Sequence, residues 1–179
     1  MFFVGESELP IVDDDFRDVL PCAVRDDYSA IWEKTRAMCQ WALACRDWNY
    51  LFHADDDTYV HVPRWQHAAA DLRDDYVGRA LAHDWWPFEY ASGGAGWWLS
   101  RRAVAIVSER LGAHVGRYRV QGRTIVEDDV LVGRVLRDAG MAVVDDPRYD
   151  WTAAATLRAD QITAHWLGPS AMLALHRSV

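Results

Sequence analysis

The stretch Tyr-Leu-Phe-His-Ala-Asp-Asp-Asp-Thr-Tyr-Val, residues 50–60, places three aspartates directly after a short apolar run. An apolar run of this length, bounded by polar residues, is typical of a buried strand, so residues 49–54 are predicted to form the central strand. Open α/β sheets bind ligands beyond the carboxyl ends of their strands, where Asp55, Asp56 and Asp57 stand. The stretch therefore predicts both the sheet and the position of a ligand site.

Three adjacent carboxylates repel one another, which costs stability unless a positive charge lies among them. Carboxylate oxygens are the ligands that Mg²⁺ and Mn²⁺ prefer. On an extended backbone Asp55 and Asp57 point to one face and Asp56 to the other, so an Asp-x-Asp pair is able to share one cation. The alternative is a solvated acidic turn, because aspartates are common in turns.

Composition indicates one globular domain. The chain has 179 residues, of which 51% are hydrophobic, and this predicts a single domain over residues 1–179. The net charge of -8 excludes a general electrostatic footprint for nucleic acid or anionic lipid. Cys22, Cys39 and Cys45 are odd in number and not closely paired, so we expect reduced, mostly core thiols in a cytoplasmic protein. We expect neither a signal peptide nor a membrane span.

Strand and helix patterns alternate along the chain. Strands are predicted at residues 1–5, 19–24, 49–54, 76–82, 95–99 and 141–144. Helices are predicted at 28–46 with Asp27 as N-cap, 63–72, 101–111 ended by Gly112, and 129–139 ended by Gly140. Residues 6–17 and the aromatic segment 83–90 are predicted loops. The alternation predicts an α/β fold with a mostly parallel central sheet and helices on both faces.

A glycine-rich segment, Ala-Ser-Gly-Gly-Ala-Gly-Trp-Trp at residues 91–98, is the second candidate site. Glycine lets a ligand approach the backbone closely, and tryptophan faces can stack against a sugar ring. The alternative is a tight turn into a strand whose tryptophans fill the core. Upstream, Trp85 and Trp86 lie in the predicted aromatic loop, where large apolar side chains need a partner or a cover.

Two further acidic or titratable features complete the pattern. Glu127-Asp128-Asp129 begins a predicted helix, where the helix dipole stabilises negative charge. One of these carboxylates is a candidate general base placed across a cleft from the metal site, and a simple helix cap is the alternative. His165 stands alone near the C-terminus, and a lone histidine is more often a surface or core residue than a ligand.

Taken together, these segments resemble the fringe-like and β-1,3-galactosyltransferase family of glycosyltransferases, from about residue 1 to residue 165. The matching segments, in order, are Asp26-Asp27-Tyr28, Glu33-Lys34-Thr35, residues 50–60, residues 91–96 and residues 127–133. Their order and spacing are more specific than any single motif. The resemblance implies a single GT-A domain that binds a nucleotide-sugar through a metal.

The resemblance also implies roles for residues at the matching positions. Asp57 is the expected ligand of Mn²⁺ or Mg²⁺, with Asp55 and, by its order in the chain, His165. The donor-binding residues implied are Asp55, Asp56, Lys34, Gly93 and Gly94. The residues expected to contact the substrates are Trp85, Trp86, Ala95, Gly96 and Trp97. Asp128 is the expected catalytic base, with Asp129 as the alternative because the registers differ by one residue.

The implied activity is inverting transfer of a hexose or N-acetylhexosamine from a UDP-sugar to a hydroxyl of a glycan acceptor, with a β-1,3 linkage. The family usually carries a strand and helix before the segment that resembles residues 1–5. We therefore expect the first nucleotide-binding strand to be missing and a homo-oligomer or partner chain to complete the pocket. One alternative is a catalytically inactive nucleotide-sugar or glycan-binding module. Another is an Asp-cluster phosphate-ester hydrolase, although a second set of metal-binding histidines is lacking.

Overall fold

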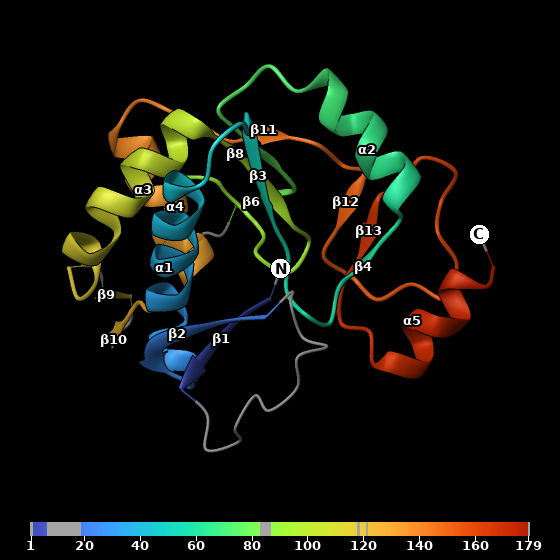
Figure 1. Cartoon of the computed structure of the whole chain (residues 1–179), viewed down its shortest axis with the longest axis horizontal. Coiled ribbons are helices and arrows are strands. Elements are labelled where there is room, and N and C mark those ends of the chain that lie inside the picture. Colours follow the sequence, from blue (N-terminus) through green and yellow to red (C-terminus); the bar gives the residue numbers. More distant parts are fainter. Residues whose placement is uncertain (1, 7–18, 83–86, 118, 121, 179) are drawn as a thin grey trace.

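The computed structural model describes residues 2–6, 19–82, 87–117, 119–120 and 122–178, and it has the expected mixed α/β content (Figure 1). The helices are α1 (Ile31–Ala44), α2 (Val62–Asp71), α3 (Arg101–His114), α4 (Asp128–Asp138) and α5 (Pro169–His176). The strands are β1 (Phe2–Glu6), β2 (Val19–Arg25), β3 (Tyr50–His53), β4 (Tyr59–Val60), β5 (Tyr76–Gly78), β6 (Ala80–Leu81), β7 (Tyr90–Ala91), β8 (Trp97–Ser100), β9 (Arg119–Val120), β10 (Arg123–Thr124), β11 (Val144–Asp145), β12 (Tyr149–Asp150) and β13 (Thr163–Ala164).

The central sheet has the strand order β11-β5-β8-β3, and its directions are mixed. β11 is parallel to β5, whereas β8 is antiparallel to both β5 and β3. The prediction of a mostly parallel sheet is therefore wrong in this respect. Between β5 and β8 the chain turns back through the antiparallel β6–β7 pair. Parallel neighbours need a long crossover, usually a helix, and this connection is not of that kind.

Helices cover both faces of the sheet, as the sequence predicted (Figure 1). On one face, α1, α3 and α4 pack on a core that includes Trp97 and Leu99 of β8. On the other face, α2 packs on a second core that contains Trp98. Side chains alternate between faces along a strand, so the two neighbouring tryptophans enter different cores. Trp98 lies against Phe52, with ring centroids 4.8 Å apart.

The predicted helix boundaries differ from the structure most at the end of α3 and at the start of α1. α3 continues past Gly112 to His114. A glycine inside a helix costs about 1 kcal/mol, and here it lies against Arg36 of α1 in the packed α1–α3 interface. Asp27 precedes a 3-10 turn and its side chain makes no capping hydrogen bond, so α1 begins only at Ile31. Gly140, with φ of 79°, follows the end of α4 as predicted.

A second, three-stranded sheet has the order β12-β13-β4. β13 is antiparallel to β4 and parallel to β12. The pairing of Ala164 with Tyr59 brings the end of β13 beside the chain that leaves the three aspartates. This small sheet therefore determines where His165 lies.

Other predictions concern the termini, the loops and the cysteines. The predicted loop at residues 6–17 lies, from residue 7 onward, outside the described residues. Cys22 and Cys39 are buried free thiols, and Cys45 is a half-buried free thiol, as expected. Among the helices in the described ranges, none combines the length and the apolar composition that crossing a membrane requires.

Candidate active site

The three aspartates form a tight turn directly beyond β3. The backbone N–H of Thr58 donates to the carbonyl of Asp55 at 3.2 Å, which closes the turn. The Thr58 hydroxyl donates to the carbonyl of Gly94 at 2.6 Å. Asp55 and Asp57 are half-buried, whereas Asp56 is exposed. The turn therefore separates Asp56 from the other two carboxylates and attaches them to the glycine-rich segment.

His165 lies against the same two carboxylates. Its Nε2 is 2.9 Å from Oδ1 of Asp57 and 3.7 Å from Oδ2 of Asp55. One ligand atom from each of the three residues lies within 4.8 Å of the others. His165 is only 9% exposed, so its ring is fixed by its surroundings. The structure thus brings together the three residues that the resemblance implied as metal ligands.

The environment of Asp55 disfavours an isolated negative charge. Burial raises the pKa of the Asp55 carboxyl, and the charges of Asp128 and Asp57 raise it further. His53 and His165 act in the opposite direction. A cation between these carboxylates would remove the repulsion. Two carboxylates and one imidazole form a donor set that suits Mn²⁺ and is rich enough in oxygen for Mg²⁺.

The Gly93-Gly94 pair connects the aspartate turn with the start of α4. A Cβ atom at Gly94 would lie 2.0 Å from Cε1 of His165, so no side chain fits there. The backbone N–H of the preceding Gly93 donates to Oδ2 of Asp129 at 3.0 Å. Consecutive residues of one segment therefore contact both His165 and Asp129.

Asp128 and Asp129 have different environments although they are neighbours in the chain. Asp128 is 5% exposed and accepts a hydrogen bond from the Thr35 hydroxyl of α1. Asp129 is half-buried and accepts hydrogen bonds from the backbone N–H groups of Gly93 and Val130. Burial, together with the Asp128 charge, raises the pKa of Asp129 to about 7, and the two N–H donors moderate this increase.

Three residues expected to contact a sugar lie inside the protein instead. Trp97 is 0% exposed and stacks on His53 with ring centroids 4.6 Å apart, so its face is not available to a ligand. Ala95 is also 0% exposed, and its carbonyl accepts a hydrogen bond from Thr163. Gly96 is buried against the ring of Phe52. The alternative interpretation, a turn into a strand with core tryptophans, therefore describes this part of the segment.

Three predicted contact residues remain, Trp85, Trp86 and Lys34. Trp85 and Trp86 lie outside the described residues. Lys34, in the first turns of α1, forms an ion pair with Asp26, which follows β2. The Lys34 ammonium group therefore pairs with a carboxylate outside the aspartate turn.

Sequence reasoning missed the role of Thr35. It is a polar residue at a position that helical spacing assigns to the buried face of α1, and it is 3% exposed. A buried hydroxyl needs a hydrogen-bond partner, and Asp128 provides it. The polar residue among apolar neighbours was the available signal, but the sequence does not indicate its partner.

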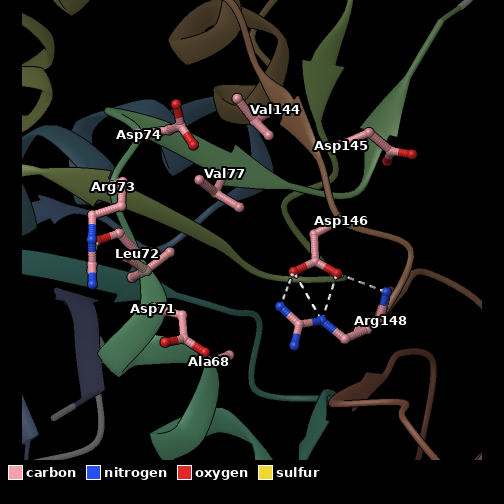
Figure 2. A pocket seen from close by; sticks show the side chains of 10 residues that line it. All are labelled: Ala68, Asp71, Leu72, Arg73, Asp74, Val77, Val144, Asp145, Asp146 and Arg148. Carbon is pink, nitrogen blue, oxygen red and sulfur yellow. Dashed lines mark hydrogen bonds and ion pairs between the residues drawn. The ribbon is translucent and has the colours of Figure 1, made fainter.

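A separate cavity of about 220 Å³ lies between the end of α2 and the β5–β11 edge of the sheet (Figure 2). Within it, Arg148 forms a two-point ion pair with Asp146, with Nη2 2.7 Å from Oδ2 and Nε 2.9 Å from Oδ1. The residues that line it are Ala68, Asp71, Leu72, Arg73, Asp74, Val77, Val144, Asp145, Asp146 and Arg148. None of the residues assembled around His165 is among them.

Comparison with known proteins gives a family match. The sequence profile of the Fringe-like family matches residues 15–150. No curated protein matches the chain. The matched range contains the aspartate turn, the Gly93-Gly94 pair and the acidic start of α4, whereas His165 lies beyond it. The chain therefore belongs to the Fringe-like family, and this membership implies an activity of the glycosyltransferase type.

Proposed function

We propose that the protein is a metal-dependent, inverting glycosyltransferase that moves a hexose or N-acetylhexosamine from a UDP-sugar to a hydroxyl of a sugar acceptor. One observation carries the proposal. Gly94 lies against His165, which is next to two carboxylates, and the N–H of Gly93 donates to the Asp129 carboxylate. A candidate cation site and a candidate base therefore lie near each other, as the proposed reaction requires.

Asp55, Asp57 and His165 are the residues that would hold Mn²⁺ or Mg²⁺. Their close approach and the raised pKa of Asp55 support this assignment, because the cluster gains most from a positive charge. When bound, the cation would supply positive charge that stabilises the departing nucleotide diphosphate. Asp56 is exposed at the same turn and is available to donor hydroxyl groups.

We assign the base to Asp129, the alternative of the two residues that the sequence left open. A general base works best with a pKa near the operating pH, and the pKa of Asp129 is raised to about 7. Asp128 is buried and accepts a hydrogen bond from the Thr35 hydroxyl. Its charge helps to raise the pKa of Asp129, so we regard Asp128 as a positioning residue.

In the proposed step, a carboxylate oxygen of Asp129 takes the proton from the acceptor hydroxyl. The acceptor oxygen forms a bond to the anomeric carbon while the bond from that carbon to UDP breaks. Attack from the face opposite the leaving group inverts the configuration, so a UDP-α-sugar gives a β-linked product. The Gly93 N–H keeps the carboxylate oriented during the transfer.

Thermal unfolding with UDP and Mn²⁺ tests the metal site. UDP with Mn²⁺ at about 100 times the dissociation constant should raise the melting temperature by about 5–10 °C. Asp57→Ala should lose this increase, and Asp74→Ala, which removes an exposed carboxylate at the separate cavity, should keep it. No increase in the wild type, or an undiminished one in Asp57→Ala, would overturn the metal site.

Release of UDP from a panel of UDP-sugars, with simple glycosides as acceptors, tests turnover. Transfer by the wild type supports the enzyme. Binding of UDP and Mn²⁺ without transfer across the panel would instead identify a nucleotide-sugar-binding module. The same assay on Asp129→Asn and Asp128→Asn decides which of the two carboxylates is the base.

A further inference from the structure

Two tryptophans beside His165 are exposed, in contrast with the buried Trp97 and Trp98. Trp166, directly after His165, is 67% exposed, and Trp151, directly after β12, is 45% exposed. The backbone N–H of His165 donates to the carbonyl of Thr152, the residue after Trp151, at 3.3 Å. Trp166 therefore belongs to the segment of the candidate metal ligand, and Trp151 belongs to the neighbouring segment that is hydrogen-bonded to it.

Trp166 has a strained backbone. Its φ of 61° lies in the left-handed region, which is unusual for a bulky residue and costs about 1–3 kcal/mol. Asp57 maintains this conformation from both sides. Its side chain contacts Nε2 of His165 at 2.9 Å, and its carbonyl accepts the N–H of Leu167 at 3.0 Å. The centroid of the Trp166 ring lies 5.0 Å from that of His165.

Burial does not explain this arrangement, because the ring stays in solvent. Strained residues that the surrounding structure maintains tend to occur at ligand sites. A tryptophan face suits the C–H face of an uncharged sugar ring. His165 and Asp129 contact adjacent glycines, so Trp166 directly follows a residue that shares the Gly93-Gly94 pair with the proposed base.

On the basis of the proposed function, we propose that Trp166, with Trp151, forms a stacking platform for a sugar ring of the acceptor. Trp166 is the principal contact because it is more exposed and lies next to His165. Trp151 provides a second apolar face on the neighbouring segment. The platform would align the acceptor so that a hydroxyl group points toward Asp129.

Saturation-transfer NMR of the whole chain with UDP and Mg²⁺ tests the proposal. The probes are the methyl glycosides of galactose, glucose, N-acetylglucosamine and fucose. We expect transfer to the sugar C–H protons of at least one glycoside in the wild type. Trp166→Ala should reduce this signal about fivefold, Trp151→Ala less, and Trp166→Phe should preserve most of it. Leu173→Ala, an exposed apolar residue of α5, should leave it unchanged.

The response of each variant to UDP and Mn²⁺ in thermal unfolding separates this proposal from the proposed function. Retained stabilisation by UDP in Trp166→Ala, with a lost glycoside signal, supports the platform. An equal glycoside signal in Trp166→Ala and wild type would overturn it, as would the absence of signal from every glycoside in the wild type. Loss of UDP stabilisation in Trp166→Ala would assign the ring to the nucleotide and also overturn the platform. Failure of the wild type itself to respond to UDP and Mn²⁺ would overturn the proposed function.

Discussion

Residues 55–57 and 127–129 are both runs of three acidic residues, but their carboxylates have different kinds of neighbours. In the first run, Asp55 and Asp57 face an imidazole at the exit of a strand. In the second run, Asp128 and Asp129 accept hydrogen bonds from uncharged donors at the start of a helix. The aspartates of residues 55–57 therefore have a neighbour that can carry positive charge, whereas those of residues 127–129 have neutral hydrogen-bond donors.

This difference determines the chemistry that each run can perform. Carboxylates that share a face with an imidazole are suited to holding a cation. A carboxylate surrounded by neutral donors and a second carboxylate is protonated more easily, and the pKa of Asp129 rises to about 7. Neighbouring groups, and not residue type, separate a candidate ligand from a candidate base.

The largest expected effect concerns the second run. Asp129→Asn should lower turnover by about 10²–10⁴-fold, because the amide cannot accept the proton from the acceptor hydroxyl. Asp128→Asn should lower it less, since that residue acts through its neighbour. Measured kcat for UDP release, with unchanged stabilisation by UDP and Mn²⁺, would establish the contrast. Equal losses in the two variants would remove the distinction between base and positioning residue.

Gly94→Ala should disrupt the cluster of Asp55, Asp57 and His165 without replacing any ionisable residue. The new Cβ would lie 2.0 Å from Cε1 of His165, so the imidazole has to leave its present position beside the carboxylates. We expect a loss of about 1–3 kcal/mol in the free energy of unfolding and loss of the response to Mn²⁺. Denaturant titration and thermal unfolding measure the two effects. Gly140→Ala, at the end of α4, is a control away from the site: its φ of 79° makes this replacement destabilising too, but the response to Mn²⁺ should remain. A full response to Mn²⁺ in Gly94→Ala would contradict the packing argument.

The pH dependence of stability should report the environment of Asp129 in metal-free protein. Its pKa is about 7 in the folded state and about 4 in the unfolded state, so between these values the folded state binds more protons. Stability therefore falls as pH rises from 4 to 7. Because the side chain is half-buried, we expect about 1–2 kcal/mol, well below the full shift.

The comparison of wild type with Asp129→Asn isolates this contribution, since other carboxyl groups titrate in both proteins. Asp129→Asn should be the more stable of the two at pH 7, with the difference shrinking toward pH 4. Urea unfolding at several pH values gives the curves. Parallel curves for the two proteins would show that Asp129 titrates normally.

The smallest expected effect concerns the strained backbone of Trp166, which the contacts of Asp57 maintain. Glycine adopts a φ of 61° without strain, so Trp166→Gly should be more stable than Trp166→Ala by about 1 kcal/mol. Both variants lack the indole ring, so the effect of its loss cancels in the comparison. Chemical denaturation of both variants measures the difference. A less stable glycine variant would argue against a strained backbone at this position.

Much of the fold could be predicted from local patterns. The apolar run before Asp55 gave a strand in the central sheet, and Gly140 marked the end of α4. The direction of β8 could not be predicted, because side-chain periodicity identifies a strand but not its orientation. The choice of core for Trp97 and Trp98 depends on register, which the pairing partners determine.

The candidate site was predictable in part for similar reasons. The order of motifs indicated the residues that now lie together, and their roles as ligands and donor contacts stay predictions. Composition could not separate Asp128 from Asp129, because the separation depends on Thr35 of α1 and Gly93, which are distant in the chain. The exposed Trp166 carries no local pattern, since its conformation follows from contacts of Asp57 with its neighbours.

The position of β8 has a consequence for how the protein tolerates change. The first residue of β8, Trp97, pairs with His53 at the end of β3 and with Gly78 at the end of β5. Gly93 and Gly94, a few residues before Trp97, therefore lie near the ends of those two strands. A slip of one residue would exchange the two indoles between the cores and carry the glycines about 3.4 Å along the edge. Such a slip would disturb the packing of both cores and the geometry of the candidate site together, so a register error in β8 should lower stability and activity at once.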